Sequence, residues 1–268
     1  MTHNGHRFCG PCLSVCALLL LAVSAVPASA ASDDQNPGAP SLRPPSSADF
    51  FLGRPRVTVG LRGNWVFASA GSDIFDFVTD QLTIERSAFN RPALGVDLSI
   101  NVAPRVDVTM GFEGSMMRQG SEYRKFVDNK LLPIEQTTSL KEQAFSAGVK
   151  LALLPAGRRV SRFAWIPSKL TPYVGAGGGM LRYDFEQVGD FVDFDNSFRV
   201  FTSTFRSAGW TPSAYAAGGT DVHLFNRVFM SLEGRYTWSS AELDRDFVDF
   251  DPIDLKGFRF GAGFHYAF

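Results

Sequence analysis

The sequence predicts an all-β protein, an eight-stranded antiparallel up-and-down β-barrel that spans a membrane. Three observations predict this fold. Eight segments alternate apolar and polar residues, the polar face of these segments carries charges, and the connections between them are short at one end and long at the other. This combination is typical of the barrels of bacterial outer membranes.

The first thirty residues have the order of a secretory signal peptide. Arg7, the one charged residue, precedes a mostly apolar run at 13–26, and Ala-Ser-Ala at 28–30 supplies the small residues of a cleavage site. The apolar run is shorter than the about 20 residues that a membrane-spanning helix needs. We expect residues 1–30 to be removed, and the proline-rich residues 31–54 to form a solvated tail without regular structure.

The composition argues against several classes of protein. Lys and Arg number 26 and Asp and Glu 27, a balance that does not suggest a nucleic-acid-binding protein. All three cysteines lie within residues 1–30, so we expect no disulfide in the exported chain. Only His223 and His265 follow the signal peptide, which excludes a multi-histidine metal site. We therefore expect no cofactor.

Strands follow one another from residue 55 to residue 268, the predicted barrel domain. Each strand alternates with a period of two, as a strand with one apolar face does. The closing segment FRFGAGFHYAF is the clearest, whereas the fifth and sixth segments are rich in glycine and alanine and have a weaker pattern. The eight predicted strands are residues 56–67, 94–102, 106–113, 144–153, 172–185, 210–224, 228–238 and 258–268.

The polar face of the strands decides which environment suits the barrel. If these charges pointed inward in a water-soluble barrel, the tryptophan, phenylalanine and leucine side chains of the other face would form a very large apolar patch in water. In lipid, an apolar exterior and a hydrogen-bonded polar interior are compatible with a closed sheet. A soluble secreted sandwich is the competing interpretation. The charges expected inside the lumen are Arg62, Asp97, Glu113, Lys150, Arg182, Glu233, Arg235 and Arg259.

The connections give the same number of strands. Short turns are predicted at residues 103–105 and 225–227, whereas the connections at the opposite end are about 20 residues long. A Phe-Val dipeptide recurs in each of these long connections, and DFVDFD occurs at both 190–195 and 246–251. Four long loops and four hairpins again predict eight strands.

From about Pro55 to Phe268 the chain resembles the small eight-stranded outer-membrane barrels of the OmpA, OmpX and OmpW type. The resemblance rests on PYVGAGGGML in the fifth strand, on the strand alternation and on the closing aromatic segment. It implies the cell outer membrane as location, with outer-membrane lipid and lipopolysaccharide as surroundings. The end of the chain resembles the signal that the barrel-assembly machinery reads, which implies that role for Phe264, Tyr266 and Phe268.

The near balance of inward charges predicts ion pairs that fill a narrow lumen, because eight strands enclose a space that side chains can occupy. Arg62 with Asp97, and Glu233 with Arg259, are the expected pairs. The leading functional hypothesis is a structural barrel that stabilises the envelope and has a charge-plugged lumen. Two alternatives stay open: a narrow passive channel for small or hydrophobic solutes, and an adhesive barrel whose long acidic loops bind an unknown surface ligand.

The acidic loops raise the question of a metal site, because carboxylates bind Ca²⁺ or Mg²⁺ that bridges lipopolysaccharide phosphates. The repeated DFVDFD lacks the loop glycine and the closing glutamate of an EF-hand, so no metal site is predicted. The weak candidates for ligands are Asp190, Asp193, Asp195, Asp246, Asp249 and Asp251.

The two histidines do not predict an enzyme. Nucleophilic catalysis needs a base within hydrogen-bonding reach of the hydroxyl group. The nearest serine on the face of His223 is Ser213, far along the strand, and His265 is followed by Tyr266 and Ala267. The phase of His265 places it in the lumen.

Overall fold

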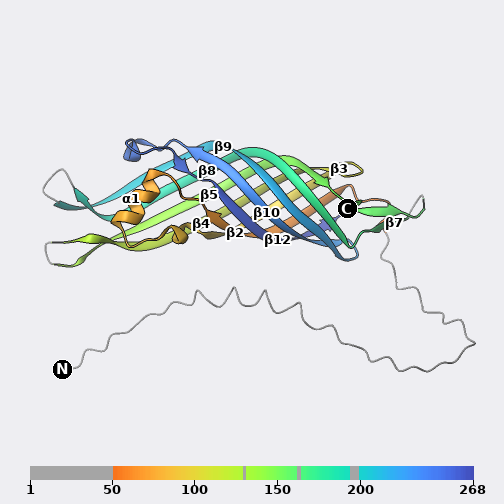
Figure 1. Ribbon diagram of the computed structural model, residues 1–268, viewed down its shortest axis with the longest axis horizontal. Coiled ribbons are helices and arrows are strands. Elements are labelled where there is room, and N and C mark those ends of the chain that lie inside the picture. Colours follow the sequence, from red (N-terminus) through yellow and green to blue (C-terminus); the bar gives the residue numbers. More distant parts are fainter. Residues whose placement is uncertain (1–50, 129–130, 162–163, 194–198) are drawn as a thin grey trace, which may run out of the picture. The chain divides into compact units, whose positions relative to one another are not determined.

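The structure is a computed structural model, and it describes residues 51–128, 131–161, 164–193 and 199–268. Its main element is a closed ring of eight antiparallel strands, which confirms the predicted fold class (Figure 1). Each strand of the ring pairs with the next along the chain, and the last pairs with the first. The strands are β2 (Val57–Ala68), β3 (Arg91–Ala103), β4 (Val106–Val127), β5 (Pro133–Ala152), β8 (Leu170–Asp193), β9 (Arg199–Phe225), β10 (Val228–Ala241) and β12 (Gly257–Ala267).

The short-turn end of the barrel carries a second, smaller sheet. The connection from β5 to β8 contains β6 (Gly157–Arg159) and β7 (Ala164–Pro167), and β7 pairs with β1 (Phe51–Leu52). The prediction that residues 31–54 lack regular structure is therefore wrong at β1, while residues 31–50 lie outside the described residues. The reason is apolar packing: Phe51 is buried and stacks on Trp165, with 5.5 Å between ring centroids.

Four strands are much longer than the alternation predicted. β4 continues to Val127 and β8 to Asp193, and β5 and β9 begin correspondingly early. About 9–11 residues suffice for a strand to cross a bilayer, so these two hairpins extend well beyond such a span. Figure 1 shows them projecting at the end where α1 (Asp73–Gln81) lies.

The outward face of these long strands changes character along their length. On β4, Met110 and Met116 are exposed, but beyond them Arg118 and Glu122 occupy the outward positions. The inward residues change in the opposite sense, since Met117 is buried further along the same strand. The apolar face is therefore outside in one half of the barrel and inside in the other.

The same inversion on β8 overturns one predicted site residue. Leu181, Tyr183 and Phe185 are buried inside the barrel, and Arg182 between them is exposed on the exterior. The prediction that Arg182 lies in the lumen is wrong, because it requires the apolar residues of this segment to face outward. They face inward because this half of the barrel encloses an apolar core.

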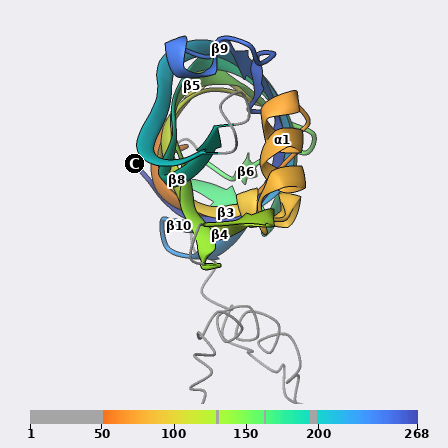
Figure 2. The same cartoon turned by 90° about the vertical axis from the view of Figure 1, so that its left-hand side faces the viewer.

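That core is built around a helix that the strand alternation does not predict. α1 packs its apolar face, which includes Ile74, Phe75 and Val78, into the long-loop half of the barrel, followed by the 3₁₀ helix η1 (Arg86–Phe89). Figure 2 shows α1 along one side of the barrel opening. The last long connection adds η2 (Arg245–Phe247) and β11 (Ile253–Asp254). Core residues include Ile74, Phe75, Val78, Leu82, Phe89, Met117, Leu140, Leu181, Tyr183, Phe185, Phe247 and Ile253.

The repeated DFVDFD does not form a repeated structure. Residues 190–193 continue β8, whereas residues 246–251 lie in η2 and the turn after it. The repeat therefore marks two long connections without giving them the same conformation.

A band of exposed apolar side chains surrounds the other half of the barrel. All eight strands contribute to it, and within the described residues no helix has the length and apolar character needed to cross a membrane. Aromatic residues border the band on both sides, a feature of barrels embedded in lipid. On the long-loop side these are Trp65, Phe67, Trp210, Trp238 and Phe258, and on the short-turn side Phe225, Tyr266 and Phe268.

Candidate functional site

The lumen at the level of the apolar band contains a network of buried ion pairs. Arg62 of β2 points inward, and its guanidinium lies 3.0 Å from Asp97 of β3, 3.3 Å from Glu233 of β10 and 3.6 Å from Glu113 of β4. Alternation places all four side chains on the inner face, as the sequence predicted. One arginine therefore joins carboxylates from three strands.

A second set of pairs continues the network toward the long-loop end. Arg259 of β12 lies 3.3 Å from Glu113 and 3.1 Å from Glu142 of β5, and Glu142 also pairs with Arg91 of β3. Arg91 and Glu142 are only 2% and 4% exposed. Neither was predicted, because both lie just beyond the predicted strand ends. Continuing the alternation by three residues at the first of these strands and by two at the other would have found both.

The predicted partners are correct in one case and wrong in the other. Arg62 pairs with Asp97, but Glu233 pairs with Arg235 at 2.9 Å instead of with Arg259. On β10 and β12, Arg235 lies directly opposite Arg259, and Glu233 lies opposite Gly261. Arg259 instead reaches the carboxylates that β4 and β5 present across the lumen.

A separate ion pair lies nearer the short-turn end. Lys150 of β5 and Asp221 of β9 approach to 2.6 Å, with 19% and 25% of their side chains exposed. The Lys150 ammonium also lies over the ring of Tyr173, 3.8 Å from its centroid. This pair is more exposed to solvent than Arg62, so removing one of its partners should destabilise the barrel less.

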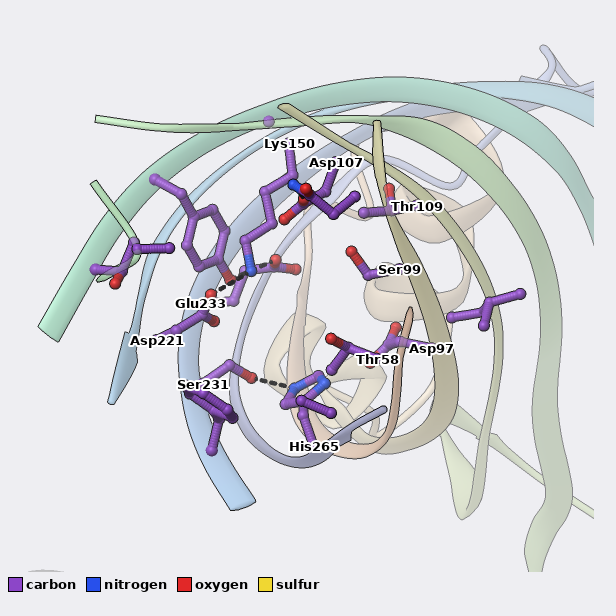
Figure 3. A pocket seen from close by; sticks show the side chains of 18 of the residues that line it. Thr58, Asp97, Ser99, Asp107, Thr109, Lys150, Asp221, Ser231, Glu233 and His265 are labelled. Carbon is purple, nitrogen blue, oxygen red and sulfur yellow. Dashed lines mark hydrogen bonds and ion pairs between the residues drawn. The ribbon is translucent and has the colours of Figure 1, made fainter. Parts of the chain in front are cut away.

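Between the ion-pair network and the short-turn end lies a polar cavity of about 150 Å³. Figure 3 shows Lys150, Asp221, Ser231 and His265 around it, on strands that face one another. Trp165 of the small sheet lines it as well, so that sheet lies at the mouth of the cavity. Figure 2 shows β6 within the ring of strands in the end-on view.

The cavity holds a serine–histidine pair that the sequence analysis did not find. Ser231 Oγ and His265 Nε2 are 2.7 Å apart, on neighbouring strands β10 and β12. Gly60 on β2 makes room for the imidazole, since a Cβ atom there would come within 2.2 Å of His265 Nδ1. No spacing within one strand indicates this pair, because its two members lie on different strands.

A hydrogen-bonded base and hydroxyl are two of the parts that nucleophilic catalysis uses. A third group normally orients the base, but within the described part of the chain no carboxylate is hydrogen-bonded to Nδ1 of His265. The arrangement resembles the other polar pairs of the lumen, which join side chains of different strands. It does not by itself suggest a reaction.

On the long-loop side of the ion-pair network, the apolar core fills the lumen. The hydroxyl group of Tyr183 donates a hydrogen bond to the carbonyl of Glu242 at 2.6 Å and lies 2.9 Å from Ser207 Oγ. Burial raises the pKa of Tyr183, so this phenol stays neutral and keeps its donor. Ions that cross the barrel would have to pass two successive layers, one charged and one apolar.

The remaining predicted residues lie outside the lumen. Phe264, Tyr266 and Phe268 face outward and are exposed at the end of the chain. Among the weak metal candidates, Asp190 accepts a hydrogen bond from Thr202, and Asp246 accepts one from the backbone of Arg206. Asp195 lies outside the described residues. Within the described ranges, no three metal-ligating side chains gather at one point.

No protein-family model and no curated protein match the chain in sequence. Its fold is similar to that of several small barrels. Neisserial surface protein A is 10% identical over 79% of this chain and 97% of its own, with a TM-score of 0.43. The outer membrane protein OprG of Pseudomonas aeruginosa is 12% identical over 81% and 99%, with a TM-score of 0.45. The attachment invasion locus protein Ail of Yersinia pestis is 13% identical over 80% and 97%, with a TM-score of 0.38.

Proposed function

We propose that this chain is an outer-membrane β-barrel that stabilises the cell envelope and keeps its lumen closed. The observation that carries the proposal is the pair of layers inside the barrel. The buried Arg62 network is followed directly by the apolar core around α1. A pore that conducts ions selectively would more often present a ring of charges of one sign, whereas here bases and acids are joined in pairs.

The apolar band supports placement of the barrel in a membrane. Lipid is the environment that removes such a band from water, and a closed sheet leaves no backbone group unpaired in it. Barrels of this kind have short periplasmic turns and longer extracellular loops. We therefore assign the small sheet with β1 to the periplasmic end, and α1 to the extracellular end.

Two arginine substitutions on β4 test the membrane boundary. Met110→Arg places a charge in the middle of the apolar band and should destabilise the barrel by about 2–4 kcal/mol. Gly120→Arg places the same charge further along the outward face, where a new Cβ would meet nothing within 4 Å, and should cost less than about 1 kcal/mol. Reversible urea unfolding in lipid vesicles measures both values. Equal costs would contradict the boundary between these residues.

The envelope role is tested in the bacterium that encodes the chain. Deleting the gene should raise sensitivity to sodium dodecyl sulfate and to vancomycin, which an intact outer membrane excludes. Expression of the wild-type chain should restore resistance, whereas uptake of small solutes should be the same with and without the gene. Unchanged sensitivity in the deletion strain would contradict a role in stabilising the envelope.

A surface-binding role is the second candidate, and one feature favours it. Val127, Leu131 and Val248 are exposed at the long-loop end, where apolar side chains have no packing role. Replacing Val127 and Leu131 by serine should weaken attachment of cells to a host surface while leaving the barrel folded. Unchanged attachment would count against this candidate. The narrow channel has no comparable support, because both layers obstruct the path.

A further inference from the structure

Three basic side chains lie side by side on the exterior, just beyond the apolar band. Arg118, Lys141 and Arg182 occupy outward positions on β4, β5 and β8, which are neighbours in the barrel (Figure 1). All three are exposed. We call them the basic row.

The strand register places the basic row at one level. Arg118 is paired with Ser139, two residues from Lys141, and Lys141 is paired with Asp184, two residues from Arg182. Such diagonal neighbours on adjacent strands are about 7–8 Å apart, within reach of long side chains. The three cations can therefore approach one ligand together.

Asp184 lies next to the basic row, and its carboxylate is already paired with a base outside the row. Arg206 of β9 holds Asp184 with two hydrogen bonds of 2.8 and 2.7 Å, and these lower the pKa of Asp184. Among the residues that the structure describes, no ion pair joins a member of the basic row to a carboxylate. Asp184 lies directly opposite Lys141, and the charges of Lys141 and Arg182 also lower its pKa. One carboxylate therefore faces these bases and Arg206, and the row keeps an excess of positive charge.

The surface below the basic row becomes apolar toward the middle of the band. Met116 and Met180 are the next outward residues on β4 and β8, whereas on β5 the exposed Gln143 precedes Phe145. A ligand that fits this surface has anionic groups at one end and hydrocarbon chains at the other. Arginine and lysine bind phosphate through short, charge-assisted hydrogen bonds.

We propose that the basic row binds the phosphate groups of a multiply phosphorylated lipid, whose acyl chains lie on the apolar band below. This rests on the proposed function, which places the row at the outer leaflet. There, the lipid of this chemistry is the lipid A part of lipopolysaccharide. The site selects for the number of phosphates, since three cations in a row across three strands can contact more than one phosphate group.

The test compares two triple variants in detergent micelles by native mass spectrometry. The probes are lipid A with two phosphates and lipid A with one. The first variant is Arg118→Gln, Lys141→Gln and Arg182→Gln. The control, which loses the same charge from the exposed short-turn end, is Arg158→Gln, Arg159→Gln and Lys169→Gln.

Wild type and control should bind diphosphorylated lipid A more tightly than the monophosphorylated form. The basic-row variant should bind the diphosphorylated form roughly a hundredfold more weakly, since each base near a membrane surface strengthens binding about fivefold. Equal losses in both variants, or a wild type that does not distinguish the two lipids, would overturn the proposal.

The wild-type comparison needs no variant and decides the case even if the triple variant fails to fold. Insertion into lipid vesicles is measured separately, by the mobility of unheated and heated protein in gels. A barrel that does not insert contradicts the proposed function, whereas one that inserts without distinguishing the lipids contradicts this inference alone.

Discussion

Replacing Glu142 by alanine should destabilise the barrel by about 3–5 kcal/mol. This carboxylate is the shared partner of Arg91 and Arg259, and all three side chains are buried. Among the described residues, its removal leaves Arg91 with two neutral acceptors, Ser115 Oγ and the carbonyl of Phe89. The midpoint of urea unfolding in lipid vesicles measures the effect.

The matched control is Asp221→Ala, which breaks the ion pair with Lys150. That pair lines the polar cavity and is partly exposed, so water replaces the lost carboxylate. We expect a loss of about 1 kcal/mol or less. If Asp221→Ala destabilises as much as Glu142→Ala, the two ion pairs do not differ in burial as the structure indicates.

The second large effect is expected for Phe75→Ala, which should cost about 3–5 kcal/mol. Phe75 is 1% exposed and contacts Phe89 and Phe185, with ring centroids 4.7 and 6.3 Å away. Its loss leaves a cavity between α1 and the barrel wall. The same unfolding measurement applies, and the helix should also become accessible to proteases.

Phe77 on the same helix provides the control, because the residue type and the helix are unchanged. Its side chain is 39% exposed, and its ring centroid lies 5.6 Å from that of Phe250. Phe77→Ala should therefore cost less than about 1 kcal/mol. Comparable losses at both positions would mean that α1 does not pack into the barrel through the face that contains Phe75.

The eight strands could be predicted because alternation depends only on which face meets the apolar surroundings. Their lengths could not, because the pattern changes phase where the interior becomes apolar. On β8 the apolar residues after Met180 look like a continuing lipid-facing strand, although Leu181 and Phe185 belong to the core. The helix had a signal of its own: Ser72 precedes acidic residues and an apolar spacing of three and four.

The phase of each strand placed seven of the eight predicted charges in the lumen, all except Arg182. It predicted the pair of Arg62 and Asp97 on adjacent strands but not the partners of Arg259, because these depend on closure of the sheet. Closure brings Arg259 of the last strand opposite Glu113 and Glu142, which lie far away in the sequence. The Ser231–His265 pair depends in the same way on the register of two neighbouring strands.

The central claim is that two layers close the lumen in series, and planar-bilayer conductance tests it most directly. The recordings compare wild type, Glu142→Ala, Phe75→Ala and the double variant. We predict no steady conductance for wild type and little for either single variant, since the intact layer still obstructs the path. The double variant should show steady conductance, because neither layer is then intact. A large, steady wild-type conductance that neither substitution changes would contradict a closed lumen.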